Sequence, residues 1–422
     1  MEAHENKEER SILLKLKNEF GNPSALESWN TSDKTQHCRW KGIECDNHDS
    51  VSRILLGYMG IKDKVPNCIC DLQNLTEIDL SENIIPGEFP ISILNCSRLQ
   101  SLDLFGNHFV GTIPNDIDRL SNLRLLNLGW NNFSSDIPSS IGNFPFLQSL
   151  DLGYNFFNGS FPREIGNLSN LEVLNMDLTN FLSSKIPNEY SSLIKLKDLW
   201  MSLSNLYGEI PDWIGNFSNL ESLDLSVNNF TGKIPENLFL LKNLRFLILS
   251  TNKLSGEIPK EIKCLEMEEI FLSRNESTGS IPEGIGLLKN LTALFLSDNR
   301  LTGEIPVWIG YLPSLELIDV SENKLSGELP KELGLHSTLQ ILDVSKNNLS
   351  GKLSKSLVNC SSLFLFSLGN NMLTGEIPAT FWSSMSLWMY YFTLVAIEQH
   401  AMTKIGLSTG PLPHQLGQPQ QF

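Results

Sequence analysis

Residues 291–306 read L-T-A-L-F-L-S-D-N-R-L-T-G-E-I-P, and copies of this stretch fill most of the 422-residue chain. The first apolar residue of each copy recurs with a period of about 24 residues. These residues are Leu75, Leu99, Leu123, Leu147, Leu171, Leu196, Leu220, Leu244, Met267, Leu291, Leu315, Leu339 and Leu363. A constant period indicates a solenoid in which each turn contacts its neighbours. With a degenerate first copy that begins at Val51, the sequence predicts about 14 turns.

Each copy combines residues with distinct expected roles. Its leucines alternate with exposed positions, as on a short strand with one buried face. Asn299 follows, and we expect its side chain to bond backbone groups of the adjacent turn that would otherwise be buried without partners. Gly303 permits a backbone bend, and Pro306 fixes the next segment as extended. The asparagine is replaced in the sixth and seventh copies by Thr179 and Ser204.

The full pattern, L-x-x-L-x-L-x-x-N-x-L-x-G-x-I-P, resembles the plant-specific leucine-rich repeat. The resemblance covers roughly residues 7 to 386 and implies an α/β solenoid, a right-handed superhelix of about 14 turns with a parallel sheet on its concave face. The same repeat serves receptor kinases, receptor-like proteins and secreted inhibitors, so it indicates the fold more specifically than the function.

Composition and charge narrow the classes of function. With 41% hydrophobic and 19% charged residues, the chain can bury a long continuous core. The formal net charge of −16 disfavours nucleic acid as a partner, because nucleic acid binds basic surfaces. We expect three regions: an N-terminal cap over residues 1–50, repeats over 51–386, and a degenerate terminal repeat with a disordered tail over 387–422.

The cap is predicted from apolar spacing and from a second resemblance. Helical spacing indicates a short amphipathic helix that covers the open end of the first turn, through Ile12, Leu13, Leu16 and Phe20. The stretch C-R-W-K-G-I-E-C, from Cys38 to Cys45, resembles the amino-terminal cap of plant leucine-rich repeat receptors. That resemblance implies a disulfide between these cysteines and a packed tryptophan, with two free buried thiols as the alternative. A metal site is less favoured, because no second cysteine pair or histidine cluster completes four ligands.

The remaining cysteines follow the repeat. Cys70 and Cys96 lie in consecutive turns, and adjacent strands are only ~4.8 Å apart, so these two can form a disulfide. Cys68 competes for the same partner. Cys264 and Cys360 lie four turns apart and cannot pair with each other, so we expect buried or lone surface thiols.

Glycosylation sequons point to the secretory route, where disulfides also persist. The pattern N-x-S/T is a weak signal at any one place, because a repeat rich in asparagine and serine generates it by accident. The candidate sites are Asn30, Asn74, Asn95, Asn132, Asn158, Asn167, Asn216, Asn229, Asn275, Asn290, Asn348 and Asn359.

The concave face is the expected binding surface. The third, fifth, seventh and eighth residues of each copy should point to it, because side chains alternate along a strand. Large apolar residues recur there: Phe105, Trp130, Tyr154, Trp200, Phe246, Ile248, Phe271 and Phe295. Acidic candidates on the same face include Asp177, Asp198 and Asp298. Aromatic residues anchor interfaces, whereas acids in L-D-L-S belong to the wording of the repeat itself.

The length of this apolar stripe indicates the kind of ligand. It runs over eight strand spacings of ~4.8 Å, and an extended peptide advances ~3.3 Å per residue, so a peptide of about twelve residues fits along it. No phosphate-binding, zinc-protease or serine-hydrolase motif is present, and we predict no cofactor. V-A-I-E at residues 395–398 lacks the lysine of the kinase motif, and H-R-D and D-F-G are absent, so we predict no enzyme activity for this chain.

Several stretches resemble HAESA-like receptor kinases. They are C-D-L-Q-N-L-T-E-I-D-L-S at 70–81, P-G-E-F-P at 86–90, N-D-I-D-R-L at 115–120 and E-L-G-L-H-S at 332–337. The resemblance implies a small secreted peptide on the concave face and a shorter leucine-rich repeat co-receptor kinase near the carboxyl-terminal turns. Many such receptors clamp the carboxylate of the peptide with R-x-R on a late strand. Leu365 and Ser367 stand at the corresponding positions here, which puts carboxylate capture in doubt.

The ends of the chain lack the expected membrane signals. Residues 1–10 are charged and carry no secretory signal, and the 13 mostly apolar residues 385–397 are too few to cross a bilayer, which takes about 20. We therefore expect part of a cell-surface receptor whose membrane span and kinase are missing. A secreted inhibitor of a cell-wall-degrading enzyme of a pathogen, or a non-signalling remnant, is the alternative.

Overall fold

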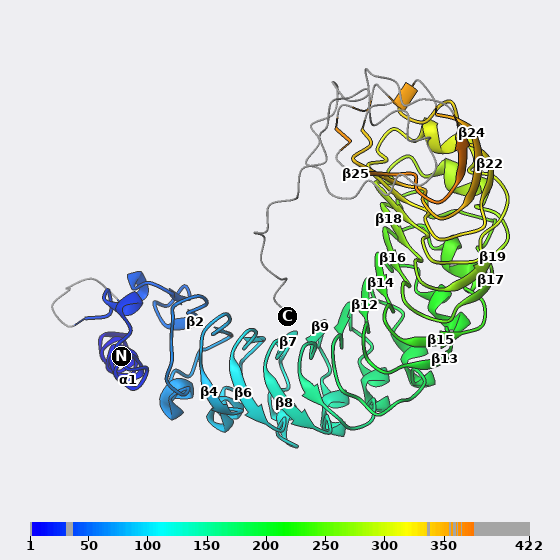
Figure 1. The fold of residues 1–422 in the computed structure, drawn as a ribbon. Helices are drawn as coiled ribbons and strands as arrows, with labels where there is room; N and C mark the ends of the chain where they lie inside the picture. The colour runs from blue at the N-terminus through cyan, green and yellow to red at the C-terminus, as the bar shows by residue number, and fades with distance from the viewer. Residues whose placement is uncertain are drawn as a thin grey trace, which may run out of the picture.

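A computed structural model describes residues 2–30, 37–335, 338–353, 356–357, 360, 362–363 and 365–374. Its turns stack into an open arc, and one long sheet lines the inner side (Figure 1). β1 (Ile43–Cys45) is antiparallel to β2 (Val51–Leu55) and belongs to the cap. The other strands are parallel, one in each turn: β3 (Glu77–Asp79), β5 (Ser101–Asp103), β7 (Leu125–Asn127), β9 (Ser149–Asp151), β11 (Val173–Asn175), β12 (Asp198–Trp200), β14 (Ser222–Asp224), β16 (Phe246–Ile248), β18 (Glu269–Phe271), β20 (Ala293–Phe295), β21 (Leu317–Asp319), β23 (Ile341–Asp343) and β25 (Leu365–Ser367). With β2, the described part holds 14 parallel strands, which confirms the predicted solenoid.

The outer side carries short strands and 3₁₀ helices. The strands form four small sheets, ordered β10-β8-β6-β4, β13-β15, β17-β19 and β22-β24-β26. Their bounds are β4 (Pro86–Glu88), β6 (His108–Gly111), β8 (Asn132–Ser135), β10 (Phe156–Phe157), β13 (Tyr207–Glu209), β15 (Asn229–Thr231), β17 (Ser255–Glu257), β19 (Glu276–Thr278), β22 (Ser326–Glu328), β24 (Asn348–Lys352) and β26 (Met372–Thr374). The 3₁₀ helices of the turns are η3 (Asn67–Asp71), η4 (Ile91–Asn95), η5 (Ile117–Arg119), η6 (Ser139–Asn143), η7 (Arg163–Asn167), η8 (Asn188–Ser192), η9 (Asp212–Asn216), η10 (Glu236–Leu240), η11 (Glu283–Leu287) and η12 (Val307–Tyr311).

The glycine and proline of the repeat act as expected. Gly303 has φ +81°, a left-handed conformation that side chains disfavour. Pro306 is extended, with φ −64° and ψ 145°, and immediately precedes η12. The sequence G-x-I-P therefore leads the chain from the outer side strand into the next 3₁₀ helix.

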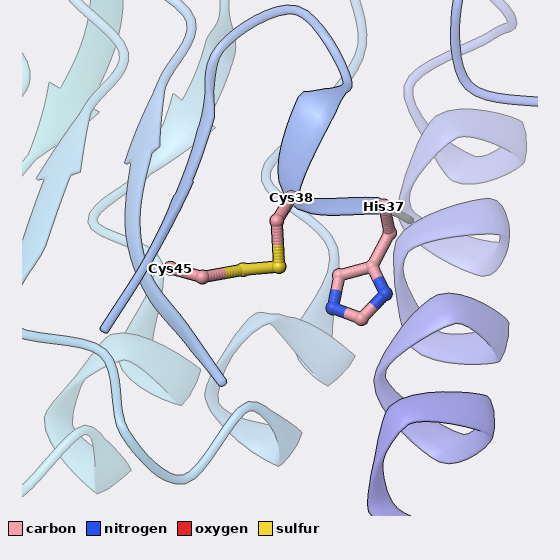
Figure 2. Close-up of side chains that lie close together, drawn as sticks. All are labelled: His37, Cys38 and Cys45. Carbon is pink, nitrogen blue, oxygen red and sulfur yellow. A yellow bond between two sulfur atoms is a disulfide. The ribbon is translucent and has the colours of Figure 1, made fainter. Parts of the chain in front are cut away.

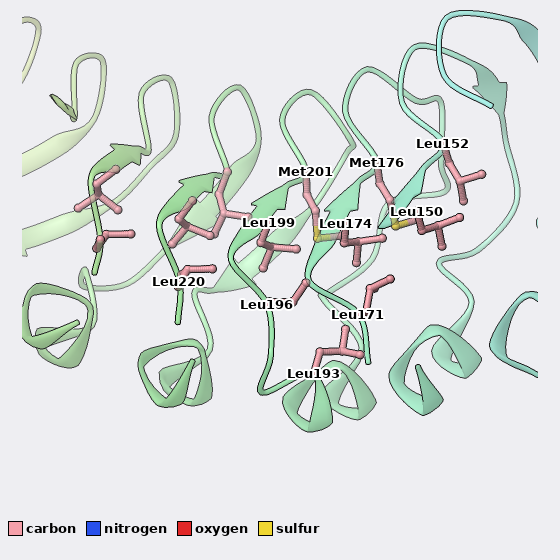
Figure 3. Close-up of a cluster of buried hydrophobic side chains, with 14 of the residues drawn as sticks. Leu150, Leu152, Leu171, Leu174, Met176, Leu193, Leu196, Leu199, Met201 and Leu220 are labelled. Atoms are coloured by element: carbon pink, nitrogen blue, oxygen red, sulfur yellow. The ribbon is translucent and has the colours of Figure 1, made fainter. Parts of the chain in front are cut away.

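The core is a column of leucines that runs the length of the arc. Leu150, Leu174 and Leu199 are the middle residues of three successive inner strands and lie in register. All three are buried, and Figure 3 shows them among the leucines and methionines of the neighbouring turns. Because each turn lacks apolar walls of its own, the stack supplies the burial.

The repeated asparagine bonds the backbone of the preceding turn, as predicted. Asn107 Nδ2 donates to the carbonyl of Leu80 at 2.9 Å, and its Oδ1 accepts from the amide of Ile85 at 3.0 Å. Thr179 and Ser204 replace this residue in two turns and instead place their hydroxyls on the carbonyl of Met176. The outer strands are interrupted at the same place, since β10 and β13 belong to separate sheets.

The residue before this asparagine is left-handed in every copy. The φ values at this eighth position lie between 49° and 64°. The residues are Tyr58, Glu82, Gly106, Trp130, Tyr154, Leu178, Leu203, Val227, Thr251, Arg274, Asp298, Glu322, Lys346 and Asn370. Such a conformation is strained for a side chain with Cβ, most of all for a β-branched one. The ladder of backbone bonds between turns holds it, for example from the amide of Val227 to the carbonyl of Ser250 at 2.9 Å.

The amino-terminal cap closes the first turn. Helix α1 (Glu2–Glu19) begins earlier than the apolar spacing indicates and buries Leu13 and Leu16 against the core. Two short 3₁₀ helices follow, η1 (Ser24–Leu26) and η2 (His37–Arg39). Trp29 and Trp40 are buried and stack with ring centroids 5.9 Å apart.

Two disulfides tie the cap and the first turns. Figure 2 shows the bond between Cys38 and Cys45, with His37 beside it. The donor atoms of these three residues lie within 4.8 Å of one another, but the two sulfur atoms are bonded to each other and are not metal ligands. The second disulfide joins Cys70 to Cys96 across adjacent turns, with Cα atoms 5.1 Å apart. Cys68, Cys264 and Cys360 are free and buried.

Candidate ligand-binding surface

The inner strands present alternate residues to the hollow of the arc. In β9, Leu150 is buried while Ser149 and Asp151 are half-buried. The same pattern holds in most inner strands, as the alternation of side chains requires. We use the term concave positions for the third, fifth, seventh and eighth residues of each copy, counted from its first apolar residue.

Three of the predicted aromatic residues gather at the carboxyl ends of the strands. Phe105 stands at a seventh position, and Trp130 and Tyr154 stand at eighth positions of the next two turns. The rings of Trp130 and Tyr154 stack with centroids 4.3 Å apart, and the centroid of Phe105 lies 6.3 Å from that of Trp130. Trp130 is 53% exposed. A large aromatic surface is therefore presented to solvent without a covering group from this part of the chain.

The other predicted apolar residues lie on the strands themselves. Trp200, Phe246, Ile248, Phe271 and Phe295 occupy third or fifth positions and are half-buried. Trp200 Nε1 donates to Ser222 Oγ at 2.8 Å, and the rings of Phe271 and Phe295 stack at 4.7 Å. The stripe is thus two tracks, one along the strand ends and one along the strand centres.

The first track continues through residues that the choice of aromatic residues missed. Leu178, Leu203 and Val227 follow Tyr154 at successive eighth positions, and Leu203 and Val227 are exposed. We call Trp130, Tyr154, Leu178, Leu203 and Val227 the apolar row. The signal was present in the sequence, because the eighth position had been assigned to the concave face and these residues are apolar.

Most of the fifth-position acids serve the fold. Asp103 Oδ1 accepts from the amide of Phe105 at 2.9 Å, and Asp151 Oδ1 accepts from the amide of Gly153 at 2.9 Å. Asn127 makes the same turn with its own Oδ1 and donates to Asp103 Oδ2 at 3.3 Å. Burial raises the pKa of Asp103 to about 6 and also raises that of Asp151. Closing the turn thus accounts for the Oδ1 atom of each of these carboxylates.

The three acidic candidates have different surroundings. Asp177 Oδ1 accepts from the amide of Ser202 at 2.5 Å, and burial raises its pKa to about 6. Burial, followed by the charge of Glu221, raises the pKa of Asp198. Asp298 is exposed at the left-handed eighth position. Asp177 is closest to the apolar row, since its neighbour Leu178 belongs to it.

The prediction of a glycan on Asn275 is wrong. Its Nδ2, the atom that carries a glycan, donates to the carbonyls of Leu249 at 3.0 Å and Leu272 at 3.1 Å. The residue is only 9% exposed, because it belongs to the asparagine ladder. A sugar at this atom would displace both bonds and the adjacent turn.

The other sequons remain predictions. Eight of those asparagines are exposed: Asn95, Asn132, Asn158, Asn167, Asn216, Asn229, Asn290 and Asn348. Asn30 and Asn74 are half-buried, and Asn359 lies outside the described residues. None of the exposed eight occupies a concave position, so glycans on them would leave the hollow of the arc open.

The last described inner strand agrees with the expected orientation. In β25, Leu365 and Ser367 are half-buried and Phe366 between them is buried. The two outward places of this strand therefore hold an apolar and a hydroxyl side chain, neither of which can form an ion pair with a carboxylate. The degenerate stretch 385–397 and the tail lie outside the described residues. Among the described helices, none has the length and apolarity that a bilayer crossing requires.

Comparisons with known proteins place the chain. A leucine rich repeat N-terminal domain matches residues 6–46, and the leucine-rich repeat matches 98–120, 122–144, 146–168, 219–241, 243–265, 290–312, 314–335 and 338–360. The ectodomain of the Arabidopsis receptor kinase HAESA, solved with the peptide hormone IDA and the co-receptor SERK1, has a TM-score of 0.82 and 33% identity, covering 90% of this chain and 68% of that chain. The plant peptide hormone receptor RGFR1, solved with RGF2, has a TM-score of 0.67 and 35% identity, covering 75% of this chain and 55% of that one.

Curated relatives agree with the structural neighbours. MDIS1-interacting receptor like kinase 1 of Arabidopsis thaliana is 36% identical over 109 residues, which are 26% of this chain and 10% of that protein. The chain belongs to the plant leucine-rich repeat receptor kinases and corresponds to their ectodomain.

Proposed function

We propose that the chain is the extracellular recognition domain of a cell-surface receptor and binds a secreted peptide along its concave face. The observation that carries this proposal is the set of large apolar side chains on that face, led by the exposed stacked pair of Trp130 and Tyr154. Exposed apolar patches of this kind mark interaction sites, and aromatic residues supply most of the binding energy in such interfaces.

The neighbours support a peptide as the occupant. HAESA was solved with a peptide hormone and RGFR1 with RGF2. The two apolar tracks extend from Phe105 in the third turn to Phe295 in the eleventh, a length that suits an extended peptide of about twelve residues. Leu365 and Ser367 on β25 supply no positive charge, so we expect a ligand whose terminal carboxylate is not bound by an ion pair on this strand.

We further propose that a shorter leucine-rich repeat kinase acts as co-receptor. HAESA was solved together with SERK1, which supports a partner of this kind. The ligand and the co-receptor would then form one assembly on the cell surface, and the signal would pass to a kinase that this sequence does not contain.

The proposal is tested by calorimetric titration of the secreted protein with a panel of synthetic plant peptide hormones. We expect one saturable ligand with micromolar or tighter affinity. A folded protein that binds no member of the panel, but inhibits a cell-wall-degrading enzyme of a pathogen, would replace the receptor with the inhibitor.

A further inference from the structure

The charge of the concave face changes along the arc. From β5 to β14, all residues of which the structure describes, the concave positions hold five acids and no lysine, arginine or histidine. The acids are Asp103, Asp151, Asp177, Asp198 and Asp224. The nearest cations stand just before the strands and are engaged: Lys197 Nζ lies 2.7 Å from Glu172 Oε2, and Arg124 lies over the ring of Phe146.

The apolar row lies over these same turns. Its stacked pair, Trp130 and Tyr154, exposes aromatic surface beside the acids. The amide of Tyr154 donates to the carbonyl of Asp177 at 2.7 Å, so Asp177 lies in the turn directly beside it. The pKa of Tyr154 is raised by burial and then by the charges of Asp177 and Asp224. An aromatic face with carboxylates nearby attracts a cation both by its quadrupole and by charge.

Glycine lets one of these carboxylates approach the backbone beside Trp130. Gly129 stands at the seventh position beside Trp130, and a Cβ built there would lie 2.7 Å from Asp151 Oδ1 and 3.2 Å from the ring of Phe105. Farther along the arc the seventh position is serine, and the hydroxyl of Ser226 bonds Asp224 Oδ1 at 2.6 Å. Asp151 Oδ1 and the ring of Phe105 therefore lie against the backbone next to Trp130, with no side chain of this position between them.

We propose that the apolar row and the aspartates beside it bind a cationic segment of the peptide ligand, with a lysine or arginine side chain seated on Trp130 and Tyr154 between Asp151 and Asp177. This inference rests on the proposed function and specifies the chemistry of the ligand. Charge complementarity selects this occupant, because an acidic segment would meet five carboxylates with no cation on the concave positions to offset them. A neutral apolar segment would cover the carboxylates without a positive charge to offset their desolvation.

The test uses the secreted chain and a displayed library of random dodecapeptides. We expect selected peptides to carry arginine or lysine flanked by apolar residues. A synthetic copy of one binder, with its arginine replaced by the neutral isostere citrulline, should bind at least about tenfold more weakly, as the loss of a cation–π contact and an ion pair predicts. On Asp177→Asn, which keeps the acceptor for Ser202, the arginine and citrulline peptides should differ by less than about threefold. Because this change creates the sequon N-L-T at residues 177–179, the parent and all variants are produced in the bacterial periplasm, where no glycan is added to it.

Two controls make the result specific. Asp212→Asn removes an exposed charge in η9 on the outer side and should leave the preference for arginine intact. Trp130→Leu keeps an apolar side chain but removes the aromatic face, so it should weaken the arginine peptide more than the citrulline peptide. Neutral or acidic binders, or equal affinity for the two synthetic peptides, would overturn the inference and leave the receptor in place. Selection of no peptide at all would overturn both.

Discussion

Trp130 and Tyr154 stack with their planes 17° apart, although each holds a left-handed backbone. They occupy the same position in consecutive turns, so the repeat itself brings their rings together. The amide of Trp130 donates to Gly153 and that of Tyr154 donates to Asp177, and these bonds hold the strained conformation. The same conformation recurs at the eighth position of every described copy, so the fold of the repeat fixes both rings before any ligand binds.

Replacing Trp200 or Phe246 with alanine should abolish or strongly weaken peptide binding while the protein stays folded. Both residues are half-buried on the strands, and truncation of an interface aromatic typically costs 2 kcal/mol or more, a loss of about thirtyfold in affinity. Calorimetry with the cognate peptide measures the change, and circular dichroism checks the fold. Tyr311→Ala, an exposed aromatic in η12 on the outer side, is the matched control. Unchanged affinity in both variants would show that the strand track is not the site.

Replacing Cys38 with serine should lower the free energy of unfolding by about 2–4 kcal/mol, because the disulfide with Cys45 restricts the unfolded chain. Thermal unfolding of the two proteins under oxidising conditions measures this. Cys264→Ser removes a buried thiol that makes no disulfide and separates the loss of the bond from the loss of packing. Equal midpoints for the parent and the Cys38 variant would contradict the role of the disulfide.

Replacing Asn131 with alanine should destabilise the arc by about 2–3 kcal/mol, because the amide of Phe109 loses its acceptor and three carbonyls lose a donor. Thr179→Ala is the comparison. Its hydroxyl donates to Met176 and contacts Ser204, so we expect a cost nearer 1 kcal/mol. Denaturant unfolding of both variants measures the two losses in free energy of unfolding. Equal losses would mean that the asparagine stabilises the fold no more than the threonine does.

Stability should depend on the ionisation of Asp177. Its carboxyl has a pKa of about 6 in the folded protein and 3.8 as the ordinary value, so the folded state binds the proton more tightly. The free energy of unfolding of the parent should therefore fall as pH rises from about 4 to about 6, and Asp177→Asn should lack this part of the fall. At pH 7 the variant should be more stable by up to about 3 kcal/mol. Urea titrations at pH 4, 5, 6 and 7 test this, with Asp212→Asn as the control that keeps the slope of the parent.

Replacing Val227 with asparagine should raise the free energy of unfolding by about 1 kcal/mol, because asparagine tolerates the left-handed backbone that a β-branched residue resists. The same change at Ile84, an exposed β-branched residue that is not left-handed, should bring no gain. Peptide affinity should fall in the Val227 variant if the apolar row contacts the ligand. Thermal midpoints of the two variants decide the first point, and a loss of stability at Val227 would contradict the strain.

The sequence predicted the solenoid well because the fold is encoded in each copy. Leu294, Asn299 and Pro306 each have one role that recurs in most turns, and the structure confirms the role of all three. The break in the outer strands is also traceable, since Thr179 and Ser204 lack the amide that bridges turns. The burial of Asn275 could also be predicted, because its position in the repeat is that of the asparagine that bonds the preceding turn.

The shape of the binding surface was less accessible. Phe105 and Phe271 both occupy concave positions, yet one lies beyond a strand and the other within it. A count along the repeat gives the face but does not separate the two tracks, which depend on where the strand ends and the left-handed residue begins. Leu178 and Val227 do not stand out in the sequence, because an aliphatic residue at one position carries little signal until its exposure is known.

The spacing of the inner strands determines which residues of a bound extended peptide meet equivalent positions on the turns. Strands repeat every ~4.8 Å, whereas an extended chain repeats every ~3.3 Å, so the two periods coincide after about two strands and three residues. The two spacings therefore differ between these points and match again at regular intervals. Every third residue of a bound extended peptide meets an equivalent position on a turn, and the two residues between meet other positions along the sheet. A three-residue periodicity in the sequences of the peptides that bind would then reflect the spacing of the turns of the solenoid.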